Sequence, residues 1–400
     1  MRVAIAGCGI AGLAAASALA RAGHDVTLYE RFSEPRPLGA GLLLQPSGLA
    51  ALRWLGLEPA ACQAGARIER LYGRTPAGRR VMDLRYAEAA ADDHGVGIHR
   101  ASLFGLLHTS ALEAGARIET GAEIAGLTEG GQPRFILANE DETPPADLAV
   151  IADGTHSTLR RAICPGARER LYPWGAVWAV VEDRDGRWTR EGELAQIYRG
   201  CEVMIGILPV GRDPLHPDRD ASVSLFWSLR PADEPAWRTD GLSAFRRQLN
   251  RHWPESATLL DGEADLSGFS LATYRDIRCS RWHRGQAVLI GDAAHGTSPQ
   301  LGQGANLALG DAVALADTLE PGRLLHPVLT RFENRRRPTV RFYSWASWAL
   351  TPLFQSRSRF LAFWRDLLFG PLSRLPVIRN IMAATLTGRG AFPPWGGNRR

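Results

Sequence analysis

The chain has 400 residues, of which 45% are hydrophobic and 22% charged, and its net charge at pH 7 is +5. This length and composition are typical of a folded protein with two domains rather than a single core. All 47 basic residues are arginine, which excludes the Schiff-base lysine of pyridoxal enzymes and the lysine of a phosphate-binding P-loop.

The first thirty residues have the pattern of a βαβ unit. An apolar strand is predicted over residues 2–6, an alanine-rich helix over 13–22 and a second strand over 26–30. The turn between the first strand and the helix carries the spacing GxGxxG, formed by Gly7, Gly9 and Gly12.

Each part of this pattern suits a dinucleotide. The first glycine allows a tight turn, the second lets the backbone approach a pyrophosphate, and the third allows close contact between helix and strand. The free N–H groups and the positive end of the helix dipole favour phosphate. Glu30, at the end of the second strand, can accept hydrogen bonds from the hydroxyls of an adenosine ribose.

The middle of the chain is rich in short strands. Helices are predicted over 47–55 and 101–114, and a buried strand over 146–152 leads into Asp153-Gly154. A mostly antiparallel sheet is then predicted from strands at 176–181, 194–198, 203–208, 222–229 and 269–274, with a helix at 242–252.

A buried-strand pattern returns late in the chain, over residues 287–290, followed by Gly291-Asp292 and a helix over 305–318. We therefore expect an α/β protein whose first domain is discontinuous. The expected division is a Rossmann-like domain over 1–171 and 279–340, an inserted β-sheet domain over 172–278 and a helical segment over 341–400.

Several of these segments resemble the motifs of a known family. Residues 153–160, DGTHSTLR, are similar to a DGxxSxxR segment, and residues 291–306, with GDAAH, Pro299 and GQGAN, to a second flavin motif. Arg100 resembles an arginine that reaches the ribityl and phosphate region, and the loop at Gly41 resembles one beside the flavin ring. Together they resemble the flavoprotein aromatic hydroxylases of the para-hydroxybenzoate hydroxylase type, over about residues 1–340.

The resemblance implies a glutathione-reductase-type FAD domain, with FAD as cofactor, NADH or NADPH as transient co-substrate, and O2. It implies hydroxylation or epoxidation of a hydrophobic aromatic or polycyclic molecule through a C4a-hydroperoxyflavin. The residues expected to bind FAD are Gly7, Gly9, Ile10, Ala11, Gly12, Glu30, Arg31, Gly41, Arg100, Asp153, Gly154, Gly291, Asp292, Pro299, Gly302, Gly304, Ala305 and Asn306.

The catalytic base is not identified by the sequence. Tyr198, Trp227 and Tyr274 lie on strands expected to face the flavin, as pocket or packing residues. Asp153 and Arg160 are either a salt bridge at a strand end or, as in the family, tied to NAD(P)H use. His295 is interpreted as structural or adjacent to the cofactor.

Two other functions fit the same scaffold. One is an FAD-dependent reductase of isoprenoid double bonds, similar to the geranylgeranyl reductases. The other is a scaffold without enzymatic activity, similar to the Rab GDP-dissociation inhibitors. Flavin-dependent halogenases are disfavoured because they need a lysine, and the chain has none.

The last sixty residues are rich in aromatic side chains. They are expected either to cover the flavin domain or to form an amphipathic helix that contacts a membrane at its periphery. The arginine run 335–337 precedes Pro338, where a solvated helix end is expected.

Five widely spaced cysteines without a CxxC pair favour a reducing, cytoplasmic location. They argue against a structural zinc site, and no histidine spacing suggests another metal. The arginines form no dense face interleaved with aromatics, so nucleic-acid binding is not expected.

Overall fold

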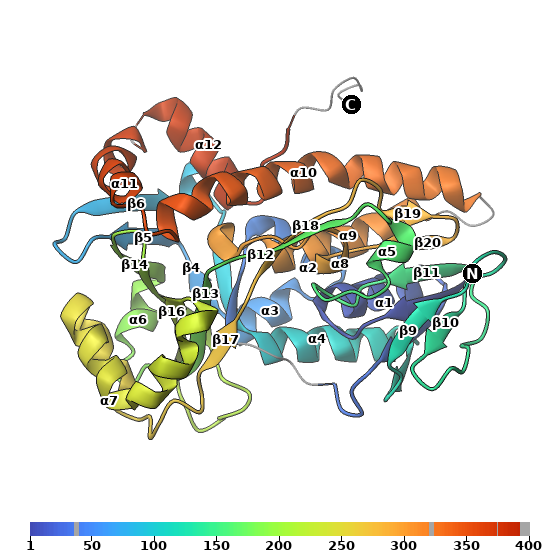
Figure 1. Ribbon diagram of the computed structural model, residues 1–400, viewed down its shortest axis with the longest axis horizontal. Helices are drawn as coiled ribbons and strands as arrows, with labels where there is room; N and C mark the ends of the chain where they lie inside the picture. Colours follow the sequence, from blue (N-terminus) through green and yellow to red (C-terminus); the bar gives the residue numbers. More distant parts are fainter. Residues whose placement is uncertain (36–39, 320–323, 374, 393–400) are drawn as a thin grey trace.

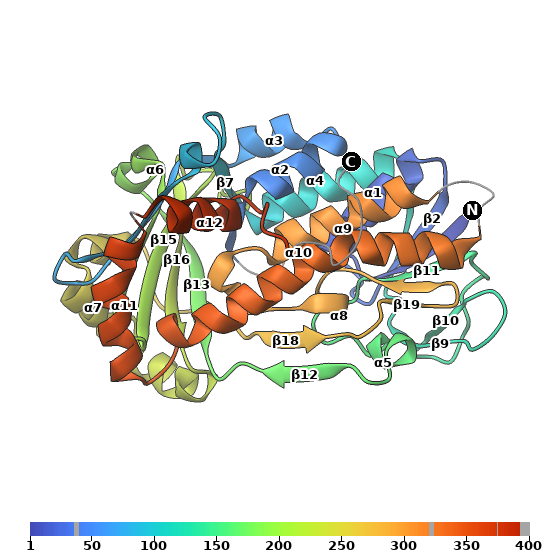
Figure 2. The ribbon, with the colours of Figure 1, turned by 90° about the horizontal axis from the view of Figure 1, so that it is seen from above.

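The computed structural model describes residues 1–35, 40–319, 324–373 and 375–392. Two large sheets lie toward opposite ends of an elongated molecule, and the long helix α10 (Leu325–Phe354) extends from one end to the other (Figures 1 and 2). The site expected from the sequence is built where the loops of the first sheet approach the second.

The first sheet has six strands in the order β19-β20-β11-β1-β2-β8. All neighbouring pairs from β20 to β8 are parallel, and β19 is antiparallel to β20. Because parallel strands end at the same edge, the segments after β1, β2, β11 and β20 meet there. The strands are β1 (Arg2–Ala6), β2 (Asp25–Glu30), β8 (Arg117–Thr120), β11 (Leu148–Ile151), β19 (His283–Arg284) and β20 (Ala287–Leu289).

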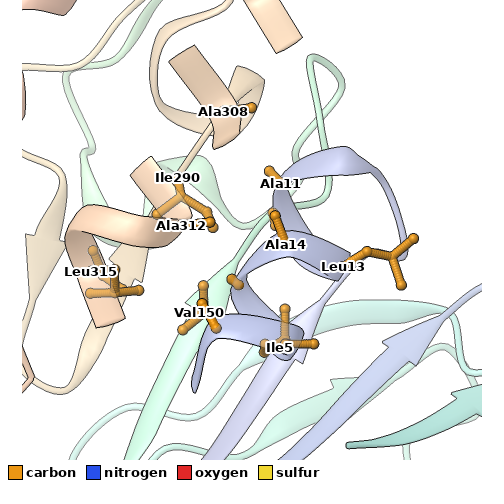
Figure 3. Close-up of a cluster of buried hydrophobic side chains, with 14 of the residues drawn as sticks. Ile5, Ala11, Leu13, Ala14, Val150, Ile290, Ala308, Ala312 and Leu315 are labelled. Atoms are coloured by element: carbon orange, nitrogen blue, oxygen red, sulfur yellow. The ribbon is translucent and has the colours of Figure 1, made fainter. Parts of the chain in front are cut away.

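Small side chains allow two helices to pack closely on this sheet. Helix α1 (Ile10–Arg21) and helix α9 (Gly304–Thr318) are in contact. Figure 3 shows alanines of both helices in one buried cluster with apolar residues of the sheet. The short alanine side chain permits a small distance between helix axes, which brings the N-terminal ends of α1 and α9 to one region.

The second sheet has seven strands in the order β17-β13-β16-β15-β14-β5-β6, and only the pair β14–β5 is parallel. Helix α7 (Glu234–His252) covers one face, where it shares a buried apolar cluster with the sheet. The strands are β5 (Arg70–Arg74), β6 (Arg80–Arg85), β13 (Gly175–Glu182), β14 (Glu193–Arg199), β15 (Val203–Gly211), β16 (Ser222–Leu229) and β17 (Ser270–Ala272).

The composition of this sheet differs from the sequence prediction in one respect. Strands β5 and β6 come from residues 70–85, which the sequence analysis assigned to the FAD domain. They belong here because β5 pairs with the free edge of β14 from Glu193 to Ile197. The division of the chain at residues 172 and 278 stays a prediction.

Smaller elements connect the two sheets. A three-stranded sheet, β3-β7-β4, lies against β15, and the pair β12–β18 forms a ribbon between the ends of the molecule (Figure 2). The remaining elements are β3 (Gly41–Leu44), α2 (Pro46–Trp54), α3 (Glu58–Ala64), β4 (Ala66–Ile68), β7 (Gly95–His99), α4 (Arg100–Glu113), β9 (Ile124–Leu127), β10 (Phe135–Leu137), α5 (Arg160–Ile163), β12 (Arg168–Leu171), α6 (Arg187–Glu191), β18 (Arg275–Arg278) and α8 (Asp292–His295), with short 3-10 turns at Tyr86–Glu88, Pro231–Asp233, Pro254–Leu260 and Pro299–Leu301.

The helix end predicted at Pro338 is wrong, because α10 continues through this residue to Phe354. All three preceding arginines pair with carboxylates, and Arg336 and Arg337 are also largely shielded from solvent. Arg336 Nε donates to Asp311 at 2.7 Å and Arg337 Nε to Glu333 at 2.6 Å. The pair with Asp311 joins α10 to α9, whereas the pair with Glu333 lies within α10.

Two further helices follow α10. They are α11 (Arg359–Leu372) and α12 (Pro376–Leu386), and both pack on β6 at the end of the molecule that holds the second sheet (Figure 1). Within the described ranges, no helix is long and apolar enough to cross a membrane.

Candidate cofactor and substrate site

The turn between β1 and α1 has the geometry that a bound phosphate group requires. Gly7 has a φ of +98°, and a Cβ on Gly12 would lie 1.9 Å from the carbonyl oxygen of Gly7. A Cβ on Gly9 would meet nothing within 4 Å, so the turn is open on that side. No side chain caps the N-terminus of α1, and its first N–H groups are free to bind an anion.

Glu30 lies at the end of β2, beside this turn. Its carboxylate accepts hydrogen bonds from the backbone N–H of Cys8 at 2.8 Å and of Phe32 at 3.1 Å. These bonds fix the carboxylate, and each oxygen retains a lone pair for a hydroxyl group. Burial and the nearby Glu30 charge raise the pKa of the Cys8 thiol to about 12, so this cysteine stays neutral. Arg31 is exposed and stacks on Phe32 at 4.5 Å.

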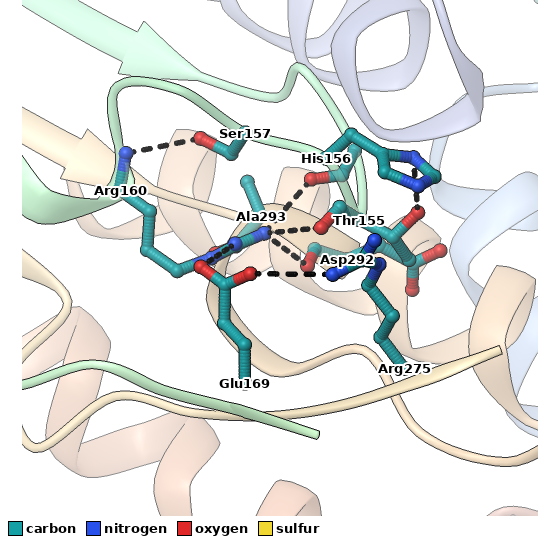
Figure 4. A network of polar contacts seen from close by, with 9 residues as sticks. Thr155, His156, Ser157, Arg160, Glu169, Arg275, Asp292 and Ala293 are labelled. Atoms are coloured by element: carbon teal, nitrogen blue, oxygen red, sulfur yellow. Dashed lines mark hydrogen bonds and ion pairs between the residues drawn. The ribbon is translucent and has the colours of Figure 1, made fainter. Parts of the chain in front are cut away.

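Arg160 connects the two flavin-type segments (Figure 4). Its fully buried guanidinium donates to the carbonyl oxygens of Thr155 at 2.9 Å, Gly154 at 3.1 Å and Ala293 at 2.7 Å, and pairs with Glu169 at 2.7 Å. Arg160 therefore does form a salt bridge, but its partner is Glu169 rather than Asp153. Arg160 is not among the expected FAD-binding residues, although the DGxxSxxR pattern contains it.

Asp153 follows β11 and lies next to the first turn, since a Cβ on Gly7 would be 3.0 Å from its Cα. Its Oδ1 is buried and has no hydrogen-bond partner among the described residues. Burial raises the pKa of Asp153, and a hydrogen bond with Ser157 opposes this shift. An unpartnered buried carboxylate oxygen of this kind is a place for a donor from a ligand.

The loop after β20 is fixed to α9 by a buried ionic cluster. Asp311 of α9 accepts from Gly291 N at 3.0 Å and contacts His295 Nε2 at 2.5 Å and Arg336 Nε at 2.7 Å. Burial alone would raise the pKa of Asp311. The charges of His295 and Arg336 outweigh this effect and lower the pKa to about 2. His295 is therefore a structural residue of this loop. Asp292, at the start of α8, is exposed.

The N-terminus of α9 forms the next wall. Gly302 has a φ of +60°, and no side chain caps the helix. Gly304 is exposed and Ala305 half-buried, whereas the Asn306 side chain is buried. Asn306 accepts from Gln45 N at 2.8 Å and donates to Leu43 O at 3.1 Å. Asn306 therefore ties α9 to β3, and its role here is positioning.

Arg100, Asp292 and Tyr274 come from three distant parts of the chain and lie close enough to influence one another. Loss of hydration next to the surrounding protein lowers the pKa of the Arg100 guanidinium, while the charges of Asp292 and Tyr274 act to raise it. The Arg100 side chain nevertheless remains accessible to solvent. Arg100 N donates to Ala40 O at 2.9 Å, which fixes the start of α4 to the segment before Gly41.

Tyr274 and Trp178 form a hydrogen bond where the second sheet approaches Arg100 and Asp292. Trp178 Nε1 donates to the Tyr274 hydroxyl at 3.2 Å, and burial raises the pKa of Tyr274 to about 12. The hydroxyl therefore keeps its proton and can donate a hydrogen bond to a ligand. The Trp178 ring also lies 4.7 Å from that of Phe226. No sequence pattern had singled out Trp178.

The structure separates the other two aromatic candidates from this contact. Successive residues of a strand point to opposite faces, so Trp227 lies in the core against Phe245 of α7 while Phe226 faces the other way. The pocket assignment of Trp227 is therefore wrong. Tyr198 is buried under Phe354, with its hydroxyl donating to Gln196 at 2.6 Å, and belongs to the packing set.

Gly41 explains how closely β3 approaches the second sheet. A Cβ there would lie 2.4 Å from Val210 and 2.7 Å from Ser224. At the other side of the site, Gly291 would place a Cβ 2.8 Å from that of Ala11. These approaches bring the first turn, the loop after β20 and the β3 strand around one region.

These residues fit FAD. Two uncapped helix N-termini, an open turn at Gly9 and a fixed glutamate are the groups that a pyrophosphate and an adenosine ribose require. Asp292 and Arg100 supply an exposed carboxylate and an exposed guanidinium for the polar middle of such a molecule.

Comparison with known proteins agrees with this geometry. The family described as FAD binding domain matches residues 1–337. The chain is 30% identical over 360 residues to 3-amino-4-hydroxybenzoate 2-monooxygenase of Streptomyces cremeus, covering 84% of each chain. It is 29% identical over 384 residues to 2-heptyl-3-hydroxy-4(1H)-quinolone synthase of Pseudomonas aeruginosa, covering 92% of this chain and 93% of the other.

A solved structure supports the fold. The crystal structure of Klebsiella pneumoniae HpxO, complexed with FAD and uric acid, has a TM-score of 0.81 to this chain. The match covers 97% of each chain at 22% identity.

Proposed function

Since the chain belongs to the FAD-binding domain family, we propose that it hydroxylates a hydrophobic aromatic ring that carries a hydroxyl or oxo group. The chain is an FAD-dependent monooxygenase, with NADH or NADPH as electron donor. When bound, FAD supplies electron transfer from NAD(P)H and the transfer of one oxygen atom of O2. The other oxygen atom leaves as water, and NAD(P)H is oxidised to NAD(P)⁺. The observation that carries this proposal is the convergence of four cofactor-type segments, two of them joined by Arg160.

The proposed roles of the residues follow from their positions. The turn from Gly7 to Gly12 and the free N–H groups of α1 bind the pyrophosphate, and Glu30 binds the adenosine ribose. Asp292 and Arg100 bind the ribityl and phosphate region. The N-terminus of α9 carries about half a positive charge, which stabilises negative charge on the flavin ring.

The substrate class is supported by the surface beside this cofactor region. The half-buried Trp178, packed on the buried Phe226, gives it an aromatic wall, and the Tyr274 hydroxyl provides one donor for a phenolic or oxo oxygen. The names of the two similar proteins above also describe rings that carry oxygen, with nitrogen in the ring of the quinolone and on the ring of the aminohydroxybenzoate. We therefore propose a hydroxylated or oxo-substituted aromatic compound, with Tyr274 orienting its oxygen.

NAD(P)H would bind transiently, because the sequence contains a single GxGxxG turn. The loop from Asp153 to Arg160 is the proposed contact for its use, supported by the unpartnered Asp153 oxygen. A cytoplasmic location is proposed as well. It is supported by the five cysteines, all of which are free thiols.

Oxygen incorporation tests the proposal directly. The purified enzyme would be supplied with NADPH, ¹⁸O₂ and a panel of hydroxyquinolones and aminohydroxybenzoates, and the products would be analysed by mass spectrometry. We expect one ¹⁸O atom in the product and one NADPH consumed per product. Turnover of an isoprenoid alkene with NADPH under anaerobic conditions would instead establish a double-bond reductase, which the similar proteins do not favour.

A further inference from the structure

Exposed apolar side chains are concentrated at the C-terminal end of the chain. Of the seventeen large hydrophobic residues exposed in the described structure, eleven follow residue 340. They are Trp345, Trp348, Phe360, Phe363, Trp364, Leu368, Leu372, Leu375, Val377, Ile381 and Phe392. Single exposed apolar residues are ordinary, but a concentrated set marks a surface that meets another apolar phase.

Helix α11 presents part of this set on one face. Phe360, Phe363 and Trp364 are spaced i, i+3 and i+4, and Leu368 continues the same face. Phe360 is 70% exposed and Phe363 61% exposed. The opposite face of the helix, with Ala362 and Arg365, is buried against the protein. The exposed aromatic face is therefore not needed for the internal packing of α11.

Charge is distributed unequally between this segment and the rest of the chain. Residues 341–400 contain nine arginines and one acid, a net charge of +8, whereas residues 1–340 have a net charge of −3. The single acid, Asp366, is paired with the buried Arg365. Arg357, Arg359 and Arg379 are exposed and form no ion pair with any described residue.

A basic hollow adjoins the exposed face of α11. It has a volume of about 600 Å³, and Phe363 lines it together with Arg79, Arg199 and Arg251. One acid, Asp366, also lines it, and its carboxylate is paired with Arg365. None of these three guanidinium groups has an ion-pair partner in the described part of the chain. Arg199 and Arg251 also help to lower the pKa of His252, after the larger effect of burial. The hollow thus provides cationic groups for an anionic head group.

We propose that α11 and α12 dock the protein on an anionic phospholipid bilayer. The aromatic side chains of α11 enter the interface between head groups and acyl chains, and the arginines around the hollow and beside α11 contact the anionic head groups. A second copy of the chain fits the surface less well. A twofold interface would place this arginine-rich surface against itself, without acids to neutralise it.

Helix α10 connects the docked surface to the site. Thr351 of α10 hydrogen-bonds Ser298 at 2.8 Å, and Gln355, just after this helix, accepts from Gln300 at 2.8 Å. Both partners lie in the loop that precedes α9. If the function is as proposed, docking holds the enzyme at the bilayer, where an apolar aromatic substrate is concentrated.

Vesicle sedimentation of the full-length, FAD-loaded protein tests the proposal. The vesicles are phosphatidylcholine alone, or with about one-quarter phosphatidylglycerol. Two variants remove the docking groups, namely Phe360→Ser with Phe363→Ser, and Arg199→Gln with Arg251→Gln. The control, Leu112→Ser with Leu215→Ser, removes exposed leucines elsewhere. Bound flavin and thermal unfolding midpoints confirm that each variant is folded.

We expect the wild type and the control to sediment with the anionic vesicles. Each docking variant should bind them about tenfold less tightly or worse, and binding of the wild type should weaken at high salt. Two results overturn the proposal. One is wild-type protein that remains in the supernatant with both vesicle types. The other is a dimer in light scattering that the Phe360→Ser, Phe363→Ser variant converts to a monomer, with no vesicle binding. Neither result bears on the oxygenation test.

Discussion

The Nε group of Arg160 donates a hydrogen bond to the carbonyl oxygen of Ala293 at 2.7 Å. Arg160 follows the segment after β11, and Ala293 follows β20, more than one hundred residues later in the chain. The same guanidinium pairs with Glu169 at 2.7 Å. One buried cation therefore fixes two loops that both border the cofactor region.

Replacing Arg160 by methionine should destabilise the fold. Glu169 would keep only the longer ion pair with Arg275 at 3.8 Å. Three backbone carbonyl groups would lose a donor, at roughly 1–3 kcal/mol for each that is left unsatisfied. The midpoint of urea unfolding and the flavin retained after desalting measure this effect. Arg161→Met is the matched control, because Arg161 is exposed. Equal midpoints for the two variants would contradict the role assigned to Arg160.

Replacing Glu30 by alanine should weaken FAD retention. Hydrogen bonds to a charged group contribute roughly 1.5–3 kcal/mol, which corresponds to about a tenfold to hundredfold loss of affinity. Flavin titration of the apoprotein measures the dissociation constant. Glu119→Ala, on the neighbouring strand β8, removes an exposed acid as the control. Undiminished affinity in Glu30→Ala would show that this carboxylate does not contact the cofactor.

Two glycine variants separate folding from cofactor binding. Gly12→Ala should prevent correct folding, because its Cβ would lie 1.9 Å from the Gly7 carbonyl oxygen. Gly9→Ala should fold normally, since its Cβ meets nothing within 4 Å, and yet bind FAD more weakly because the methyl group occupies the pyrophosphate position. Circular dichroism and flavin titration distinguish these effects. A Gly9→Ala variant that binds FAD as the wild type does would refute this position of the pyrophosphate.

Asp311 should make stability depend on acid pH. Its pKa is about 2 in the folded protein, below the ordinary value of 3.8, so its stabilising effect is present above pH 3.8 and is lost as pH falls towards 2. The contribution is about 2 kcal/mol at neutral pH. The difference in unfolding free energy between the wild type and Asp311→Asn should therefore shrink over this range. Asp317→Asn, an exposed acid of the same helix, should show no such trend.

Two tyrosine variants test which hydroxyl orients the substrate. Tyr274→Phe should lower kcat/KM about tenfold, the effect of one lost hydrogen bond, while FAD affinity is unchanged. Tyr198→Phe should change stability but not kcat/KM, because its hydroxyl bonds Gln196 in the core. Steady-state kinetics on the same substrate measures both. Equal kinetic losses in the two variants would contradict the assignment of Tyr274.

The sequence was sufficient for features that depend on local patterns. The βαβ unit, the turn at Gly7 and the late strand before Gly291 each combine an apolar run with glycines at fixed spacing. Strands β5 and β6 lack such a run. Strand β5 pairs with β14, which is distant in the chain, and β6 pairs with β5. For that reason they were not recognised as part of the second sheet.

Side-chain direction was harder to predict. Trp227 and Phe226 are adjacent, so an error of one position reverses the face to which each side chain points. The contact between Trp178 and Tyr274 joins residues 96 positions apart and leaves no signal in a single sequence. The same holds for Asp311 with Arg336, which explains why the arginine run was interpreted as a solvated helix end.

The visible spectrum of the purified protein during anaerobic reduction by NADPH tests flavin binding and substrate response together. We expect the two absorption bands of bound flavin, and bleaching that is accelerated by a hydroxylated or oxo-substituted aromatic compound. A protein that remains colourless after addition of FAD would refute the function proposed above, and with it the roles of Glu30 and Asp292.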